Sequence, residues 1–161
     1  MNALAFLKQQ HGEVAKLFSA FESSASDAKK LELFKQIADD LAVHATIEER
    51  HFYPAVRARD TKKDLVEAYD EHLEVKKLLV DCLGGTTTPG FDGKVAALKG
   101  AVEHHVGEEE NVLFPKVKKL LNADQLEAIG QALQAEAELL KSAGAPRKLV
   151  QVKIEPPAAT A

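Results

Sequence analysis

The chain has 161 residues, 45% of them apolar, which is the length and composition of one domain with one sizeable core. Lys and Arg number 21 against 25 Asp and Glu, and this net charge of −4 offers no broad basic field, so nucleic acid is not an expected partner. A single cysteine, Cys82, rules out an internal disulfide and favours a reducing compartment, with core filling as its expected role. Neither a signal-peptide pattern nor a window approaching the ~18 apolar residues of a membrane span is found, so we expect a cytoplasmic protein with no membrane partner.

Helices dominate the expected secondary structure, because Ala, Leu, Glu and Lys fill the long stretches between sparse Gly and Pro residues. Apolar residues recur at alternating steps of three and four, the spacing of an amphipathic helix, over residues 4–23, 27–55, 62–83 and 92–121. Asp27 is the expected cap of the second helix, and two consecutive glycines stop the third. The pattern predicts an all-α protein.

The last part of the chain is expected to add a fifth helix and a tail. Residues 124–141 have apolar residues at helical spacing and no histidine, so this helix should pack over the others. Three prolines follow Gly144, which divides the chain into a helical bundle over 1–143 and a flexible tail over 144–161. An alternative is that the near-alternating apolar residues of 150–154 join a partner as an added strand.

An internal repeat relates the first two helices to the next two. The heptapeptide HGEVAKL at 11–17 matches HLEVKKL at 72–78, after a shift of 61 residues without gaps. The same shift places His11 on His72, His44 on His105, Glu48 on Glu109, Glu49 on Glu110 and Pro54 on Pro115. Two repeated helix hairpins that pack face to face form an antiparallel four-helix bundle with approximate two-fold symmetry.

Histidines and glutamates occupy positions of the helical seams where the pattern calls for apolar residues. The spacing His-x3-Glu occurs at His44/Glu48 and again at His105/Glu109, and it brings both side chains to one face, one turn apart. With His11 and His72 this gives four imidazoles and two carboxylates inside a small bundle, where an unpaired ion costs several kcal/mol. One such histidine is more often a hydrogen-bonded core residue, but the paired recurrence favours a metal site.

The ligand types narrow the choice of metal. Imidazole and carboxylate without thiolate fit iron, manganese or zinc, and two bridging carboxylates in a helical bundle favour a dinuclear iron or manganese site. Each ion would take two imidazoles from one hairpin. The ligand set leaves about one coordination position per ion for an oxygen-derived ligand, which implies chemistry on small molecules.

These motifs resemble the hemerythrin-like, HHE cation-binding family, over roughly residues 3–120. The resemblance implies that two non-haem iron ions, with an oxo or hydroxo bridge, bind at the six residues. Their terminal ligands would be His11, His44, His72 and His105, and their bridging ligands Glu48 and Glu109. Oxygen-carrying hemerythrins have a fifth histidine where this chain has Lys76, and this departure argues against reversible oxygen carriage.

Five other polar residues lie near these motifs. His51 falls in the seam and is expected to be a hydrogen-bonded neighbour of the site, with a fifth ligand as the alternative. His104 is expected either at the surface or as a hydrogen-bonding neighbour of the ligands, and Glu49 and Glu110 as exposed charges or hydrogen-bond acceptors behind the ligands. Tyr69, one turn before the third histidine, is expected to pack as a core aromatic, with a hydrogen bond to a bound oxygen species as the alternative.

Three functions are compatible with such a centre. The first, a stand-alone stress or gas-handling protein that binds or senses O2, NO or related oxidants such as peroxide, is preferred. The second is a di-iron enzyme that reduces peroxide or NO or acts as an oxidase, and the third is an iron storage or buffering protein. No catalytic signature beyond the di-iron site separates them.

Overall fold

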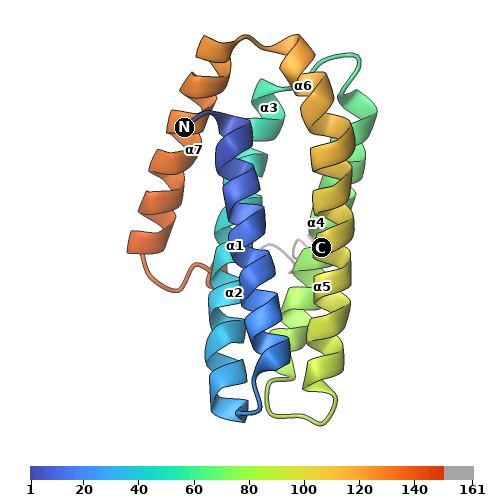
Figure 1. Ribbon diagram of the computed structural model, residues 1–161, viewed down its shortest axis with the longest axis vertical. Helices are drawn as coiled ribbons and strands as arrows, with labels where there is room; N and C mark the ends of the chain where they lie inside the picture. The colour runs from blue at the N-terminus through green and yellow to red at the C-terminus, as the bar shows by residue number, and fades with distance from the viewer. Residues whose placement is uncertain (151–161) are drawn as a thin grey trace, which may run out of the picture.

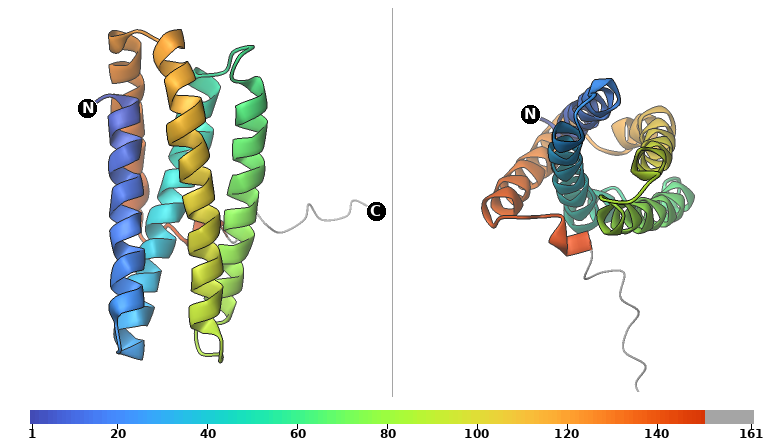
Figure 2. Two further views of the ribbon diagram at one scale, coloured as in Figure 1. Left: turned by 45° about the vertical axis from the view of Figure 1, so that its right-hand side comes forward. Right: turned by 90° about the horizontal axis from the view of Figure 1, so that it is seen from below.

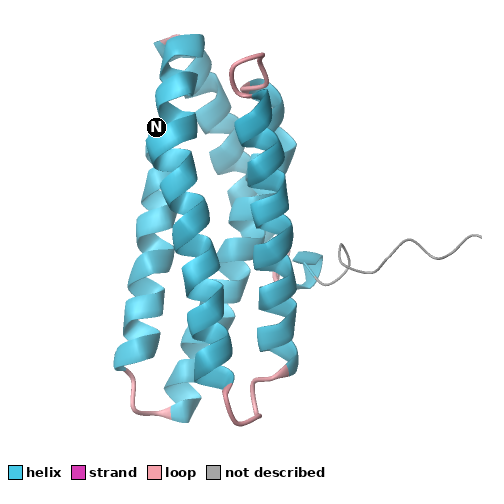
Figure 3. Cartoon of the chain, turned by 90° about the vertical axis from the view of Figure 1, so that its right-hand side faces the viewer, coloured by secondary structure: helices cyan, strands magenta, loops and turns pink. Residues whose placement is uncertain are grey.

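The computed structural model describes residues 1–150, and this part of the chain is helical with no strand (Figure 3). The first hairpin pairs α1, Ala3–Ser23, with α2, Asp27–Ile47. The second helix continues without a break through a π-helical turn, η1 (Glu48–Phe52), into the short α3 (Tyr53–Ala55). Ser26, one residue before the predicted Asp27, is the N-cap of α2 and accepts a hydrogen bond from the backbone N–H of Lys29.

The second hairpin repeats this construction. Its helix α4, Lys62–Gly84, pairs with α5, Phe91–Glu108, which continues through the π-helical turn η2 (Glu109–Leu113) into α6 (Phe114–Leu120). The two hairpins lie side by side as a four-helix bundle (Figure 1). The predicted all-α bundle of two repeated hairpins is therefore confirmed.

The fifth helix, α7 (Ala123–Ser142), lies outside the bundle against α1 and α2, as the end-on view in Figure 2 shows. Its Gly130 faces the backbone of the amino terminus, where a Cβ would lie 2.2 Å from the carbonyl oxygen of Met1. After α7 the chain returns to α2, where the backbone and side chain of Arg147 both bind the carboxylate of Asp39 and Val150 is buried. The predicted tail thus begins with a packed segment, and residues 151–161, which include most of the predicted strand, lie outside the described part.

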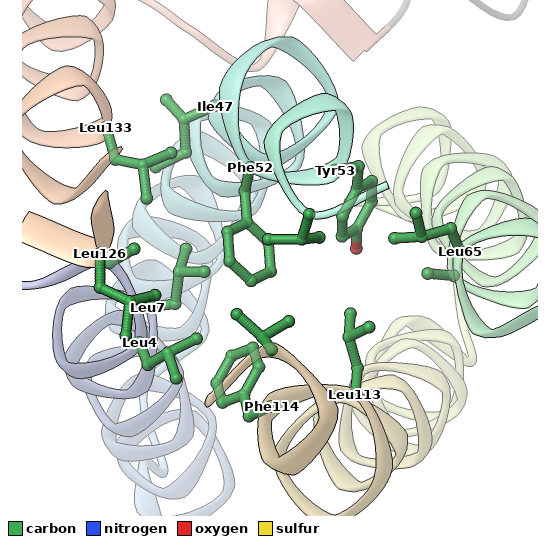
Figure 4. Close-up of a cluster of buried hydrophobic side chains, with 14 of the residues drawn as sticks. Leu4, Leu7, Ile47, Phe52, Tyr53, Leu65, Leu113, Phe114, Leu126 and Leu133 are labelled. Atoms are coloured by element: carbon green, nitrogen blue, oxygen red, sulfur yellow. The ribbon is translucent and has the colours of Figure 1, made fainter. Parts of the chain in front are cut away.

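Two apolar clusters fill the bundle, one toward each end. The cluster near α3 and α6 is built on aromatic rings, with Phe52 edge-on to Phe114 at 5.8 Å between ring centroids (Figure 4). The cluster at the opposite end includes Phe18, Phe34 and, as expected from the sequence, the buried Cys82. Between these clusters the seams carry histidine and glutamate, so the polar residues are enclosed by apolar layers above and below.

The π-helical turns determine which side chains follow the glutamates into the bundle. In each turn the backbone N–H five residues on, rather than four, bonds to the glutamate carbonyl: Tyr53 to Glu48, and Phe114 to Glu109. One extra residue per turn moves all later side chains around the helix axis. Tyr53 and Phe114 consequently take the interior positions that an uninterrupted α-helix would give to other residues.

Candidate metal centre

All six predicted ligand residues converge at mid-bundle, and each is at most 8% exposed. Their potential ligand atoms form two groups, and within each group the atoms lie within 4.8 Å of one another. The first group comprises His11, His44, Glu48 and Glu109, and the second comprises Glu48, His72 and His105. The hairpins therefore contribute one histidine pair each, and a carboxylate lies between the pairs.

Each histidine pair directs two Nε2 atoms at each other. The Nε2 atoms of His11 and His44 lie 3.2 Å apart, and those of His72 and His105 lie 3.0 Å apart. Every Nδ1 points outward to an acceptor oxygen, so it carries the ring proton and leaves a lone pair on Nε2. Two facing lone pairs at this distance repel unless a cation lies between them, as a proton or a metal ion.

The outward hydrogen bonds tie the two hairpins together. His11 on α1 donates from Nδ1 to Glu110 of the second hairpin at 2.8 Å, and His72 on α4 donates to Glu49 of the first at 3.0 Å. Glu110 and Glu49 thus accept hydrogen bonds from the outward-facing nitrogens of His11 and His72, which is one of the two roles expected from the sequence. Burial raises the pKa of Glu49, but its hydrogen bonds with His72 and Lys76 outweigh this effect and lower the pKa to about 2. An ionised acceptor fixes the imidazole orientation and strengthens its Nε2 as a ligand.

The two interior carboxylates have oxygen atoms without a hydrogen-bond donor. Among residues 1–150, neither Oε1 of Glu48 nor Oε2 of Glu109 has a hydrogen-bond partner, although both are buried. The other oxygen of Glu48, Oε2, lies 3.2 Å from His44 Nε2 and 3.1 Å from His72 Nε2, between the two hairpins. A buried carboxylate oxygen without a donor is costly, and a metal ion is a partner that would satisfy it.

The electrostatics of the centre favour positive charge. Burial lowers the pKa of His105, but the carboxylates of Glu48, Glu71 and Glu109 outweigh burial and raise it to about 10. Burial likewise raises the pKa of Glu48, but the histidines around it hold that pKa well below its usual range. Protons and metal ions would compete for the same lone pairs, because only the deprotonated imidazole is a ligand.

Tyr53 lies at the centre, although the sequence offered weaker grounds for it than for Tyr69. The side chain is 1% exposed, and its hydroxyl donates to Glu109 Oε1 at 2.8 Å and lies 3.0 Å from His72 Nε2 and 3.3 Å from Glu48 Oε2. Figure 4 shows the hydroxyl directed toward the bundle axis. Burial and the two carboxylate charges raise the pKa of this phenol well above its usual value, so it keeps its proton here. Tyr69, which was expected to pack as a core aromatic, is instead 43% exposed and packs edge-on against the ring of Tyr53.

The π-helical turn also explains where His51 lies. Its side chain is about one-third exposed, and Nε2 is 3.8 Å from Glu136 of α7, on the outside of the bundle. The expectation that His51 occupies the interior seam was therefore wrong, because that expectation assumed an uninterrupted α-helix. His104 is exposed as expected, with Nε2 3.2 Å from Glu71.

Comparison with known proteins agrees with this geometry. The sequence matches the Hemerythrin HHE cation binding domain over residues 2–117. The chain belongs to the hemerythrin HHE cation-binding family. A crystal structure of a hemerythrin HHE cation binding domain-containing protein from Mycobacterium kansasii, a homologue of Rv2633c, superposes with a TM-score of 0.78 and 25% identity, covering 92% of this chain and 99% of that one.

Two further relatives in sequence are similar over most of the chain. A protein named DNA nickase from Nostoc sp. is 35% identical over 128 residues, which are 79% of this chain but 36% of the relative, so the chain spans about a third of that protein. Rv2633c of Mycobacterium tuberculosis, which is named an uncharacterised protein, is 26% identical over 156 residues, or 95% of this chain and 94% of the relative.

A small cavity lies beside the histidines of this hemerythrin-family bundle. Its volume is about 30 Å³, and its lining combines the four histidines with apolar side chains such as Leu41, Val75 and Val102. This volume admits about one water-sized molecule. The apolar walls favour a small uncharged ligand over an ion.

Lys76, at the position of the oxygen carriers' fifth histidine, is buried but does not join the interior group. Its ammonium group forms a salt bridge with Glu49, behind His72. The interior space near His72 is instead occupied by the hydroxyl of Tyr53.

Proposed function

We propose that this hemerythrin-family protein holds two non-haem iron ions in the bundle and uses them to bind small oxidants such as O2, NO or peroxide. His11 and His44 would hold one ion and His72 and His105 the other, with Glu48 and Glu109 bridging them. The observation that carries the proposal is the pair of facing Nε2 contacts, 3.2 and 3.0 Å, on either side of buried carboxylate oxygens that have no hydrogen-bond donor.

The donor set supports iron, with manganese as the alternative. All six side chains offer imidazole nitrogen or carboxylate oxygen, and the single cysteine lies in the far apolar cluster. Tyr53 adds a phenol oxygen next to His72, either as a further ligand or as a proton donor. When bound, iron supplies redox chemistry and open coordination positions to the centre, which the protein's own side chains lack.

The cavity supports a small ligand. Its apolar walls lie directly beside the imidazoles. No helix among residues 1–150 has the length and hydropathy of a membrane span. The protein's residues would hold the ligand in a dry pocket and exclude larger molecules by size.

The cavity can be tested without disturbing the ligand residues. Val102→Phe should fill it, so the ferrous protein should keep its two iron ions but bind NO at least ten times more weakly, as followed by electron paramagnetic resonance. Val66→Phe, on the exposed face of α4, is the matched control and should bind NO as the wild type does. Unchanged NO binding by the iron-loaded Val102→Phe variant would contradict the role of the cavity.

The wild-type protein distinguishes the three functions. Steady turnover of peroxide or NO would indicate a di-iron enzyme, and release of far more than two iron ions per chain would indicate iron storage.

A second candidate function rests on charge at the end of the bundle where α3, α4 and α6 meet. Seven cations lie in two short segments there, with Asp60 as the one carboxylate of those segments, although the whole chain is net negative. They are Arg57, Arg59, Lys62, Lys63, Lys116, Lys118 and Lys119. Among residues 1–150, only Lys63 and Lys116 of this set lie within 4 Å of a carboxylate. The amino terminus of α4 adds its positive dipole end.

We propose that this cationic surface binds the phosphate backbone of nucleic acid, which is consistent with the name of the Nostoc relative and assigns no nicking activity to this chain. The net charge argued against such a partner because it averages over the whole surface. Lys119→Glu should weaken binding of a fluorescent DNA duplex at least fivefold at low salt, whereas Lys29→Glu, near the opposite end of the bundle, should not. Equal effects of the two substitutions, or no binding by the wild type, would refute this proposal.

A further inference from the structure

The internal repeat allows the two halves of the centre to be compared residue by residue, and the residues behind the histidines differ. The Nδ1 of His44 donates to the amide oxygen of Gln10 at 2.8 Å. The Nδ1 of His105 donates to the carboxylate of Glu71 at 2.7 Å. Gln10 and Glu71 are equivalent under the shift of 61 residues. The two hydrogen bonds have nearly the same length, but their acceptors differ by one negative charge.

A second difference lies inside the bundle. Tyr53 is equivalent to Phe114 under the same shift. The hydroxyl of Tyr53 is 3.0 Å from His72 Nε2, whereas the ring of Phe114 stacks against His11 at 6.2 Å between centroids and offers no oxygen. The phenol of Tyr53 therefore lies beside the pair His72 and His105, which is also the pair that has Glu71 as an acceptor.

The two other acceptors behind the histidines are carboxylates in both halves, Glu110 behind His11 and Glu49 behind His72. Each has a lysine partner: Lys76 contacts Glu49, and Lys8, whose side chain is 48% exposed, lies 3.7 Å from Glu110. Gln10 and Glu71 are therefore the hydrogen-bond acceptors whose charge differs between the halves. The other neighbour of Glu71 is His104, which is 67% exposed and is therefore well screened by solvent.

We infer that the two metal positions are unequal, and that the choice of Gln10 or Glu71 behind the histidine makes the ion at His72 and His105 the tightly held one and the ion at His11 and His44 the exchangeable one. The inference rests on the proposed dinuclear site. An imidazole that donates to a carboxylate is a more basic ligand than one that donates to an amide, and such partners typically change metal affinity 10–100-fold. The phenol oxygen near His72 acts in the same direction.

The test uses two isosteric substitutions and Co2+ as a spectroscopic probe of binding. The full-length protein is titrated with Co2+ in competition with a chelator, which yields two dissociation constants. Glu71→Gln should weaken the tighter step about 10–100-fold and leave the weaker step within about twofold. Gln10→Glu should strengthen the weaker step by a similar factor. Glu74→Gln, an exposed substitution on the same helix, should change neither step and is the control.

The outcomes separate the inference from the proposed function. If wild-type protein binds two Co2+ ions but both substitutions change the two steps equally, or change neither by more than twofold, the inference is wrong and the dinuclear site stands. If folded wild-type protein binds no Co2+ and no iron, the proposed site itself is wrong. Thermal unfolding of the metal-free variants, monitored by circular dichroism, verifies that both remain folded.

Discussion

Replacing Tyr53 by Phe removes a single oxygen atom from the centre and leaves the aromatic packing in place. The lost hydroxyl donates to Glu109 at 2.8 Å and lies within 3.3 Å of Glu48, so a buried carboxylate loses a donor. Hydrogen bonds to charged groups contribute about 1.5–3 kcal/mol. The ring itself fits, because the repeat already has Phe114 at the equivalent position. We expect metal-free Tyr53→Phe protein to lose about 2 kcal/mol of unfolding free energy, which corresponds to roughly 6 °C in Tm.

The assay is urea unfolding of the metal-free protein, followed by circular dichroism. The midpoint should decrease while the slope of free energy against urea stays the same, because the buried surface is unchanged. Tyr69→Phe is the control: that side chain is 43% exposed and contacts Tyr53 through its ring, so its unfolding free energy should change by less than about 0.5 kcal/mol. A Tyr53→Phe protein as stable as the wild type would refute the hydrogen-bonded role of the phenol.

Further predictions concern packing, pH and metal. Gly130→Ala should destabilise the protein by more than 1 kcal/mol in thermal unfolding, since its Cβ would collide with the backbone of the amino terminus, whereas Gly100→Ala, in an open helical position, should stabilise it by about 0.5–1 kcal/mol. In metal-free protein the pKa of Glu49 is about 2 in the folded state and near its ordinary value of 4.5 in the unfolded state. The unfolded chain therefore takes up the proton first, and the stability from this group should be lost as the pH falls from about 4.5 to 2 in unfolding titrations. Metal at 100 times its dissociation constant should add about 2.7 kcal/mol per site to the unfolding free energy, and a chelator should remove this gain. His51→Val should leave the iron spectrum unchanged, because this side chain faces α7.

The helices and the convergence of the six polar residues could be predicted because both depend on simple periodicity. The three-and-four spacing defined α1, α4 and α7 to within about a residue or two at each end. The shift of 61 residues aligns His11 with His72 and His44 with His105. A polar residue that recurs at equivalent positions in both repeats is stronger evidence for a metal site than a polar residue at any single position.

The π-helical turns could not be predicted from that periodicity, and they account for the main errors at the site. Because the π-helical turn contains one extra residue, Tyr53 points into the bundle, where uninterrupted α-helical spacing predicted His51. The recurrence of an aromatic residue five positions after each glutamate, just before proline, was the available indication. The partners of the outer nitrogens were only partly anticipated, because Gln10 and Glu71 depend on how neighbouring helices pack rather than on spacing along one helix.

The central claim is that two buried groups of histidine and glutamate bind two metal ions. Its most direct test is to supply ferrous iron to the folded protein without oxygen, remove unbound metal and measure the iron-to-protein ratio. We expect two iron ions per chain for the wild type and a loss of the dinuclear centre in Glu48→Ala, because Glu48 belongs to both groups. Folded wild-type protein that retains no iron, or a Glu48→Ala variant that retains both ions, would contradict it.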